Sequence, residues 1–195
     1  MVWEADEMEA FLATFAVVFL AELGDKTQLL VMAFAAKFPW RQVLVGMTLG
    51  IFVVHALAVG VGSFLGSLLD PFVMEIVASL MFLTFGLWTL RGSEDDEEEA
   101  AAGRYGPVLT VMMTFIVGEM GDKTQFAAMA MAATASSWLA VLVGAVLAMV
   151  LADSLGLVAG AFLQRYLPPA RLRWISGGIF VFFGVVGFAH ALLGR

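Results

Sequence analysis

Two copies of one acidic motif hold the residues of this sequence that could do chemistry. One copy spans residues 22–28 and the other residues 119–125, and six of their seven positions are identical. Each lies near the centre of a long apolar stretch, where ionisable side chains are costly and rarely accidental. The motifs offer carboxylate, hydroxyl and amide oxygens, which suit hard divalent cations such as Ca²⁺, Mn²⁺ and Mg²⁺, and no Cys or His, which zinc and copper prefer. They predict an oxygen-lined cation site at membrane depth.

The motif side chains have distinct predicted roles. The expected metal ligands are Glu22, Asp25, Thr27, Gln28, Glu119, Asp122, Thr124 and Gln125. Lys26 and Lys123 are expected to be counter-ions that pair on their own helix or across the repeat. The four acids and two lysines leave a net charge of minus two when all are ionised. One divalent cation would neutralise it, and so would protons, because crowded carboxylates share protons. Competition between metal and protons is a direct route to exchange.

The conformation of each motif has two possibilities. In a continuous helix, Glu22 and Asp25 share one face, as do Glu119 and Asp122. Gly24 and Gly121 permit either a local break or a close helix approach. A break would also free backbone carbonyl groups as further oxygen ligands.

Composition predicts one polytopic membrane domain. Of the 195 residues, 62% are hydrophobic and 14% are charged, whereas soluble domains average about 45–50% and about 25%. A membrane helix needs about 20 apolar residues, so the chain has room for about six. The predicted spans are Met8 to Ala36, Val43 to Leu69, Phe72 to Leu90, Pro107 to Ala133, Trp138 to Leu163 and Leu172 to Leu192. The lack of cysteine excludes thiolate chemistry, and a formal charge of -7 argues against nucleic acid as a partner.

The motifs belong to a duplication of nearly the whole chain. Outside them the copies continue to match with an offset one residue larger, as where Pro71 falls on Pro169. Because each copy has an odd number of spans, the second must cross the membrane in the opposite direction, as in secondary transporters. We expect an all-α protein with six transmembrane helices in two inverted three-helix repeats, residues 1–90 and 107–195, joined by an acidic cytoplasmic linker, residues 91–106.

Basic residues predict the orientation of the spans. Seven of the ten Lys and Arg residues lie in the first, third and fifth loops, and only Arg195 lies on the opposite side. Lys and Arg in short loops stay cytoplasmic, so both termini are expected outside. The acidic run at residues 94–99 is then cytoplasmic, where it is either a solvated linker or a segment that gathers ions.

His55 and Asp153 occupy equivalent positions in the two repeats, one span after each motif. Both side chains can carry a proton within a membrane, so the pair is a candidate proton path. The alternative is that each only hydrogen-bonds a neighbouring helix.

The duplicated E-x-G-D-K-T pattern, the six predicted spans and the charged central loop resemble the GDT-type family of manganese and calcium cation/proton exchangers, within the LysE-like transporter superfamily. The resemblance rests on residues 22–27 and 119–124 and extends over almost the full chain. It implies export of Mn²⁺ or Ca²⁺ from the cytoplasm against protons, with the motif acids as ligands and without a cofactor. Organellar members have a long N-terminal extension that this chain lacks, so a prokaryotic plasma membrane is the expected location.

Three other functions compete with exchange. A cation channel also uses acidic rings, but it cannot drive uphill transport. Intramembrane aspartyl proteases also have Gly-Asp in a membrane helix, yet here a Lys follows each Asp and no Tyr-Asp motif occurs. A scaffold would give no reason for four acids and two lysines at bilayer depth. The sequence does not predict an oligomeric state.

Overall fold

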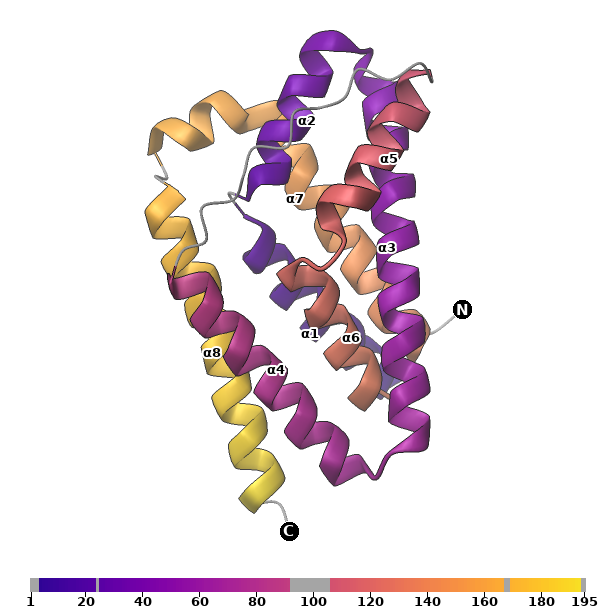
Figure 1. The fold of residues 1–195 in the computed structure, drawn as a ribbon, viewed down its shortest axis with the longest axis vertical. Coiled ribbons are helices and arrows are strands. Elements are labelled where there is room, and N and C mark those ends of the chain that lie inside the picture. Colours follow the sequence, from indigo (N-terminus) through magenta and orange to yellow (C-terminus); the bar gives the residue numbers. More distant parts are fainter. Residues whose placement is uncertain (1–3, 24, 92–105, 167–168, 194–195) are drawn as a thin grey trace.

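The computed structural model describes residues 4–23, 25–91, 106–166 and 169–193, and these form eight α-helices without strands. The helices are α1 (Ala5–Glu22), α2 (Lys26–Lys37), α3 (Trp40–Leu68), α4 (Pro71–Arg91), α5 (Pro107–Glu119), α6 (Lys123–Thr134), α7 (Trp138–Tyr166) and α8 (Pro169–Leu193). The predicted all-α class is confirmed. Figure 1 shows one bundle, with the α2–α3 turn at one end and the α3–α4 turn at the other. The acidic run at residues 94–99 lies outside the described residues.

The first and fourth predicted spans each consist of two helices. Glu22 ends α1 before Lys26 begins α2, and Glu119 ends α5 before Lys123 begins α6. α2 and α6 have 12 residues each, which at 1.5 Å per residue gives about 18 Å, too short to cross about 30 Å of hydrocarbon. Of the two possibilities left open by the sequence, the structure has the local break, because Asp25 follows the end of α1 and Asp122 follows the end of α5.

Both breaks form the same tight turn. The Asp25 N–H donates to the Glu22 carbonyl at 3.1 Å, and the Asp122 N–H donates to the Glu119 carbonyl at 3.2 Å. Gly121, inside the second turn, has a φ of +84°, a left-handed conformation that glycine adopts without steric cost. In the second break, the left-handed conformation of Gly121 therefore interrupts the helix just before Asp122.

The long helices pack against the broken helices of the other half of the chain. α3 lies along α5 and α6, whereas α7 lies along α1 and α2. α4 and α8 pack mainly against each other, as the pair at the left of Figure 1 shows. The two halves of the sequence are thus interlaced around a shared core.

Glycines bring α3 and α6 into contact backbone to backbone. A methyl group at Gly62 would overlap the carbonyl of Met129, and one at Gly66 would overlap the carbonyl of Ala133. Small residues at such crossings let helices approach closely where lipid offers no hydrophobic driving force. These two positions therefore set the distance between α3 and α6.

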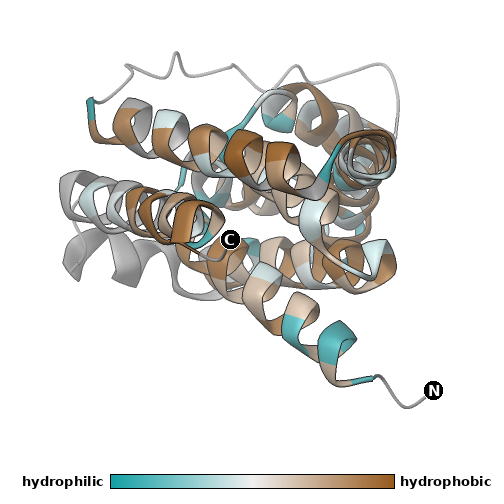
Figure 2. Ribbon diagram, turned by 90° about the horizontal axis from the view of Figure 1, so that it is seen from below, coloured by the Kyte–Doolittle hydropathy of each residue, from teal (hydrophilic) through white to brown (hydrophobic). Residues whose placement is uncertain are grey.

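The outer surface of the bundle is apolar. Phe64 and Leu68 on α3 are 62% and 64% exposed, and Phe182 on α8 is 61% exposed. Figure 2 shows hydrophobic residues along the helices and hydrophilic ones near the start of α1. In the described part of the chain, Trp40–Leu68 and Trp138–Leu155 are each long and apolar enough to cross a membrane. Large exposed apolar surfaces of this kind mark membrane contact.

We expect Gly62→Ala to destabilise the fold by about 1–3 kcal/mol, because the new methyl group meets backbone that cannot rotate away. Thermal unfolding of the purified protein in detergent measures this. The matched control is Gly60→Ala in the same helix, where a Cβ has nothing within 4 Å and where alanine favours the helix. Equal melting temperatures for the two variants would contradict the close crossing.

Candidate functional site

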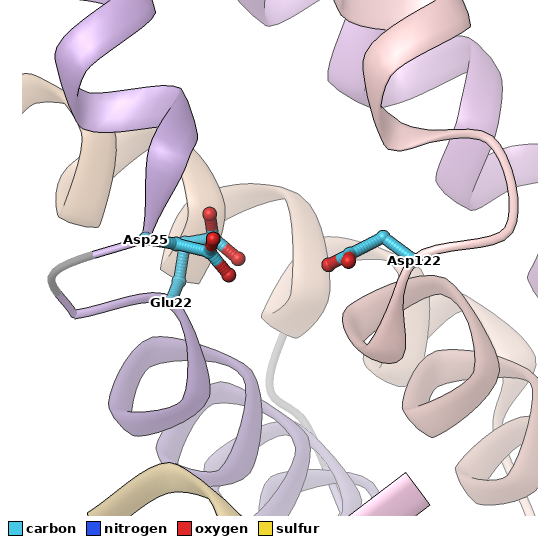
Figure 3. Close-up of side chains that lie close together, drawn as sticks. All are labelled: Glu22, Asp25 and Asp122. Carbon is cyan, nitrogen blue, oxygen red and sulfur yellow. The ribbon is translucent and has the colours of Figure 1, made fainter. Parts of the chain in front are cut away.

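Three carboxylates meet between the two helix breaks. Glu22 and Asp25 come from the first break and Asp122 from the second, and Figure 3 shows their side chains converging. One oxygen atom from each lies within 4.8 Å of the others. Two oxygens on opposite sides of a Ca²⁺ ion are also about 4.8 Å apart, since each ligand lies about 2.4 Å from the ion. The cluster therefore has the spacing of a single cation site.

Glu22 is the most deeply buried acid of this cluster. Its exposed fraction is 0%, and its Oε1 accepts a 2.5 Å hydrogen bond from the Thr27 hydroxyl. Its Oε2 has no hydrogen-bond partner among the described residues. A buried carboxylate oxygen without a donor is costly, and a bound cation or proton would remove that cost.

Lys123 joins the cluster from the second half of the chain. Its Nζ forms an ion pair with Oδ2 of Asp25, and the two side chains are 14% and 11% exposed. This is pairing across the repeat, one of the two arrangements expected for the motif lysines. The side chain of Lys26, at the equivalent position, lies outside the described residues.

The Thr27 hydroxyl also reaches α7. Its Oγ lies 2.5 Å from Oε1 of Glu22 and 3.0 Å from Oδ1 of Asp153, which is fully buried. Gln28, the next residue, donates from Nε2 to the Ala152 carbonyl at 3.0 Å. The first motif is therefore bonded to the segment that contains Asp153. Sequence reasoning placed Asp153 on a candidate proton path one span after a motif, but it did not predict the contact with Thr27.

The second motif has a different arrangement. Glu119 is 1% exposed, but it is not a member of the three-carboxylate cluster. Thr124 is buried, and its Oγ lies 3.5 Å from Oδ2 of Asp122. The Gln125 side chain accepts a 2.6 Å hydrogen bond from the Gly121 N–H, which satisfies a donor freed by the break. Three of the four motif acids thus lie in the cluster, and Glu119 lies outside it.

His55 lies fully buried in α3, which packs against α5 and α6. Its Nδ1 lies 3.0 Å from the Ile51 carbonyl, and since a carbonyl only accepts, Nδ1 carries the hydrogen. Its Nε2 has no hydrogen-bond partner in the part of the chain that the structure describes. In contrast to Asp153, His55 therefore bonds its own helix.

The sequence matches one transporter family and several named relatives over nearly its whole length. The model of the family "Divalent cation/proton antiporter GDT1" matches twice, at residues 10–97 and 107–194. A Vibrio cholerae protein named "Putative manganese exporter" is 33% identical over 178 residues, which cover 89% of this chain and 88% of the relative. A GDT1-like protein of Synechocystis is 29% identical, with 93% and 97% covered. Protein PAM71, chloroplastic, of Arabidopsis thaliana is 29% identical, with 95% and 58% covered. No solved structure matches the chain.

These matches confirm the resemblance drawn from the two motifs. The double match accounts for the duplication, and the apolar helices agree with a protein embedded in a membrane. A transporter family also excludes the protease alternative. The chain belongs to the divalent cation/proton antiporter family GDT1 and is an integral membrane transporter rather than an enzyme.

Proposed function

We propose that this protein exports Mn²⁺, and Ca²⁺ as a second substrate, from the cytoplasm of a prokaryotic cell in exchange for protons. The observation that carries the proposal is the convergence of Glu22, Asp25 and Asp122 from the two breaks onto one cation-sized space. The family supports antiport of a divalent cation and protons. The printed name of the Vibrio cholerae relative supports manganese.

In this proposal the three clustered carboxylates are the first metal ligands. Thr27 and Thr124 lie directly beside them, each within hydrogen-bond distance of one cluster acid. Glu119 ends α5 as Glu22 ends α1, so it takes the equivalent role when the second motif turns toward the metal. Gln28 and Gln125 are further proposed ligands, whose side chains bond the Ala152 carbonyl and the Gly121 N–H in this conformation. Gly24 lies outside the described residues.

Asp153 is the proposed proton carrier. The Thr27 hydroxyl has one hydrogen, so it can donate to only one of the two carboxylates that it contacts. When it donates to Glu22, the contact with Asp153 is a hydrogen bond only if Asp153 carries a proton and donates it. The Thr27 hydroxyl therefore connects a proton on Asp153 to the proposed metal ligand Glu22. His55, at the equivalent position in α3, has a buried Nε2 for the same task on the other motif.

Six spans in two inverted repeats fit the helix order. Each broken pair, α1 with α2 and α5 with α6, makes one span, and the four long helices make the others. Residues 1–90 and 107–195 are then the repeats. Both termini face outside and the linker faces the cytoplasm.

A closed pathway lies on the proposed outer side. A cavity of about 660 Å³ opens between the α4/α8 pair and the end of α6, and Phe82 and Met131 line it. Phe82 and Met131 also pack in a buried apolar cluster that includes Ala21, the neighbour of Glu22. An apolar barrier therefore separates the carboxylates from this cavity, as alternating access requires on one side at a time.

We expect proteoliposomes with an acidic interior to accumulate Mn²⁺ and Ca²⁺ against their gradients. Glu22→Gln and Glu119→Gln should each lower this uptake by about tenfold or more, because each removes one charged ligand. Metal uptake with and without the pH gradient is the measurement, and Glu9→Gln, exposed on α1, is the matched control. Full activity in both site variants would contradict the proposal, and downhill uptake indifferent to pH would indicate a channel.

Thr27→Val should uncouple the proton from the metal, since it leaves two buried carboxylates without their shared hydroxyl. We expect loss of pH-driven Mn²⁺ uptake by about tenfold, and Thr27→Ser should retain it. Uptake across a range of internal pH is the measurement. Thr84→Val, which removes an exposed hydroxyl bonded to its own helix, is the control. Unchanged uptake by Thr27→Val at every pH would exclude Thr27 from the proton path.

The orientation can be tested because the chain has no cysteine. A membrane-impermeant maleimide on intact cells should label Ser67→Cys and Ser136→Cys but not Gln42→Cys or Gly106→Cys. All four positions are exposed, and all are uncharged, so the basic residues that orient the spans are kept. Labelling after permeabilisation is the control, and the reverse pattern would show that the termini are cytoplasmic.

A further inference from the structure

We propose that the Lys123 ammonium is a tethered competitor of the transported metal, which occupies Asp25 while the site is empty and leaves it when a divalent cation binds. The inference rests on the proposed function of the same site. It makes Lys123 a specificity-determining residue as well as a source of charge.

The position of the ammonium carries the argument. Lys123 begins α6, directly after Asp122, and its Nζ pairs with Asp25 from the opposite break. Asp25 and Asp122 are both members of the three-carboxylate cluster. The ammonium therefore binds an oxygen of a proposed metal ligand.

A metal ion and this ammonium cannot share Asp25 comfortably. A divalent cation bound to Asp25 lies about 2.0–2.6 Å from its oxygen. The metal ion and the Lys123 ammonium would then both bind the carboxylate group of Asp25, with only that group between them. Both Asp25 and Lys123 are mostly shielded from solvent, with exposed fractions of 11% and 14%, so like charges repel strongly there. Metal binding therefore displaces the Lys123 ammonium from Asp25.

This competition selects for divalent ions. A monovalent cation such as Na⁺ brings the same charge as the ammonium that it would displace, so it gains little. A divalent cation brings twice the charge and interacts with all three acids. The ion pair also connects the second half of the chain to the first across the breaks. While it persists, it holds the empty site together and opposes a change of conformation without cargo.

Calorimetric titration of Mn²⁺ into the purified full-length protein tests the inference. Lys123→Met should bind Mn²⁺ about tenfold or more tightly than the wild type, because the competitor is gone. An excess of Na⁺ should weaken Mn²⁺ binding to this variant and leave the wild type unaffected. Lys123→Arg keeps the charge and should resemble the wild type. Lys37→Met, exposed at the end of α2, is the control.

The outcomes separate the inference from the proposed function. If folded Lys123→Met binds Mn²⁺ no more tightly than the wild type, the lysine is a structural counter-ion and the inference is wrong. Lys123→Gln provides the same comparison if the methionine variant does not fold. If the wild type shows no Mn²⁺ binding that Glu22→Gln removes, the metal site itself is wrong.

Discussion

The burial of carboxylates at membrane depth is the constraint on which this structure depends. Glu22 and Asp153 have no exposed surface, and water cannot offset the cost of desolvating them. In a continuous helix, the backbone N–H and C=O groups bond to one another, so none would be left to hydrogen-bond the carboxylates. The two breaks bring the Thr27 hydroxyl, the Lys123 ammonium and Asp122 to the buried acids of the first motif. These groups offset part of the cost of burying the carboxylates.

In the proposed exchange, the Thr27 hydroxyl links the metal ligand Glu22 to the proton carrier Asp153. It contacts Glu22 within its own half of the chain and Asp153 in α7. Because one hydrogen serves two acids, the state of one acid affects the hydrogen bonding of the other. Exchange needs such a link, since two independent sites would let metal and protons move separately.

Much of the fold was predictable because it follows from composition. Long apolar stretches and a repeated motif suffice for an all-α class and for the four single long helices. The breaks were not predictable, because glycine within a membrane helix is as often a packing residue as a turn, and only the left-handed φ of Gly121 distinguishes the two.

The division of the motif acids also required the structure. The two nearly identical motifs suggest four equivalent ligands, yet the cluster contains Asp122 and not Glu119. Two motifs that differ at one position can be arranged differently because each break packs against a different long helix. The pairing of Lys123 with Asp25, 98 residues apart, likewise depends on tertiary packing.

The interlacing of the two halves sets a condition on how such a protein can arise. α3 finds its partners in α5 and α6, and α7 finds its partners in α1 and α2. A chain with a single copy would leave its long helix without that contact, and its acids would face no opposing break. A single copy could form this packing only by pairing with a second chain. With both copies in one chain, each pairs with a fixed partner, and the two can differ in sequence, as they do at His55 and Asp153.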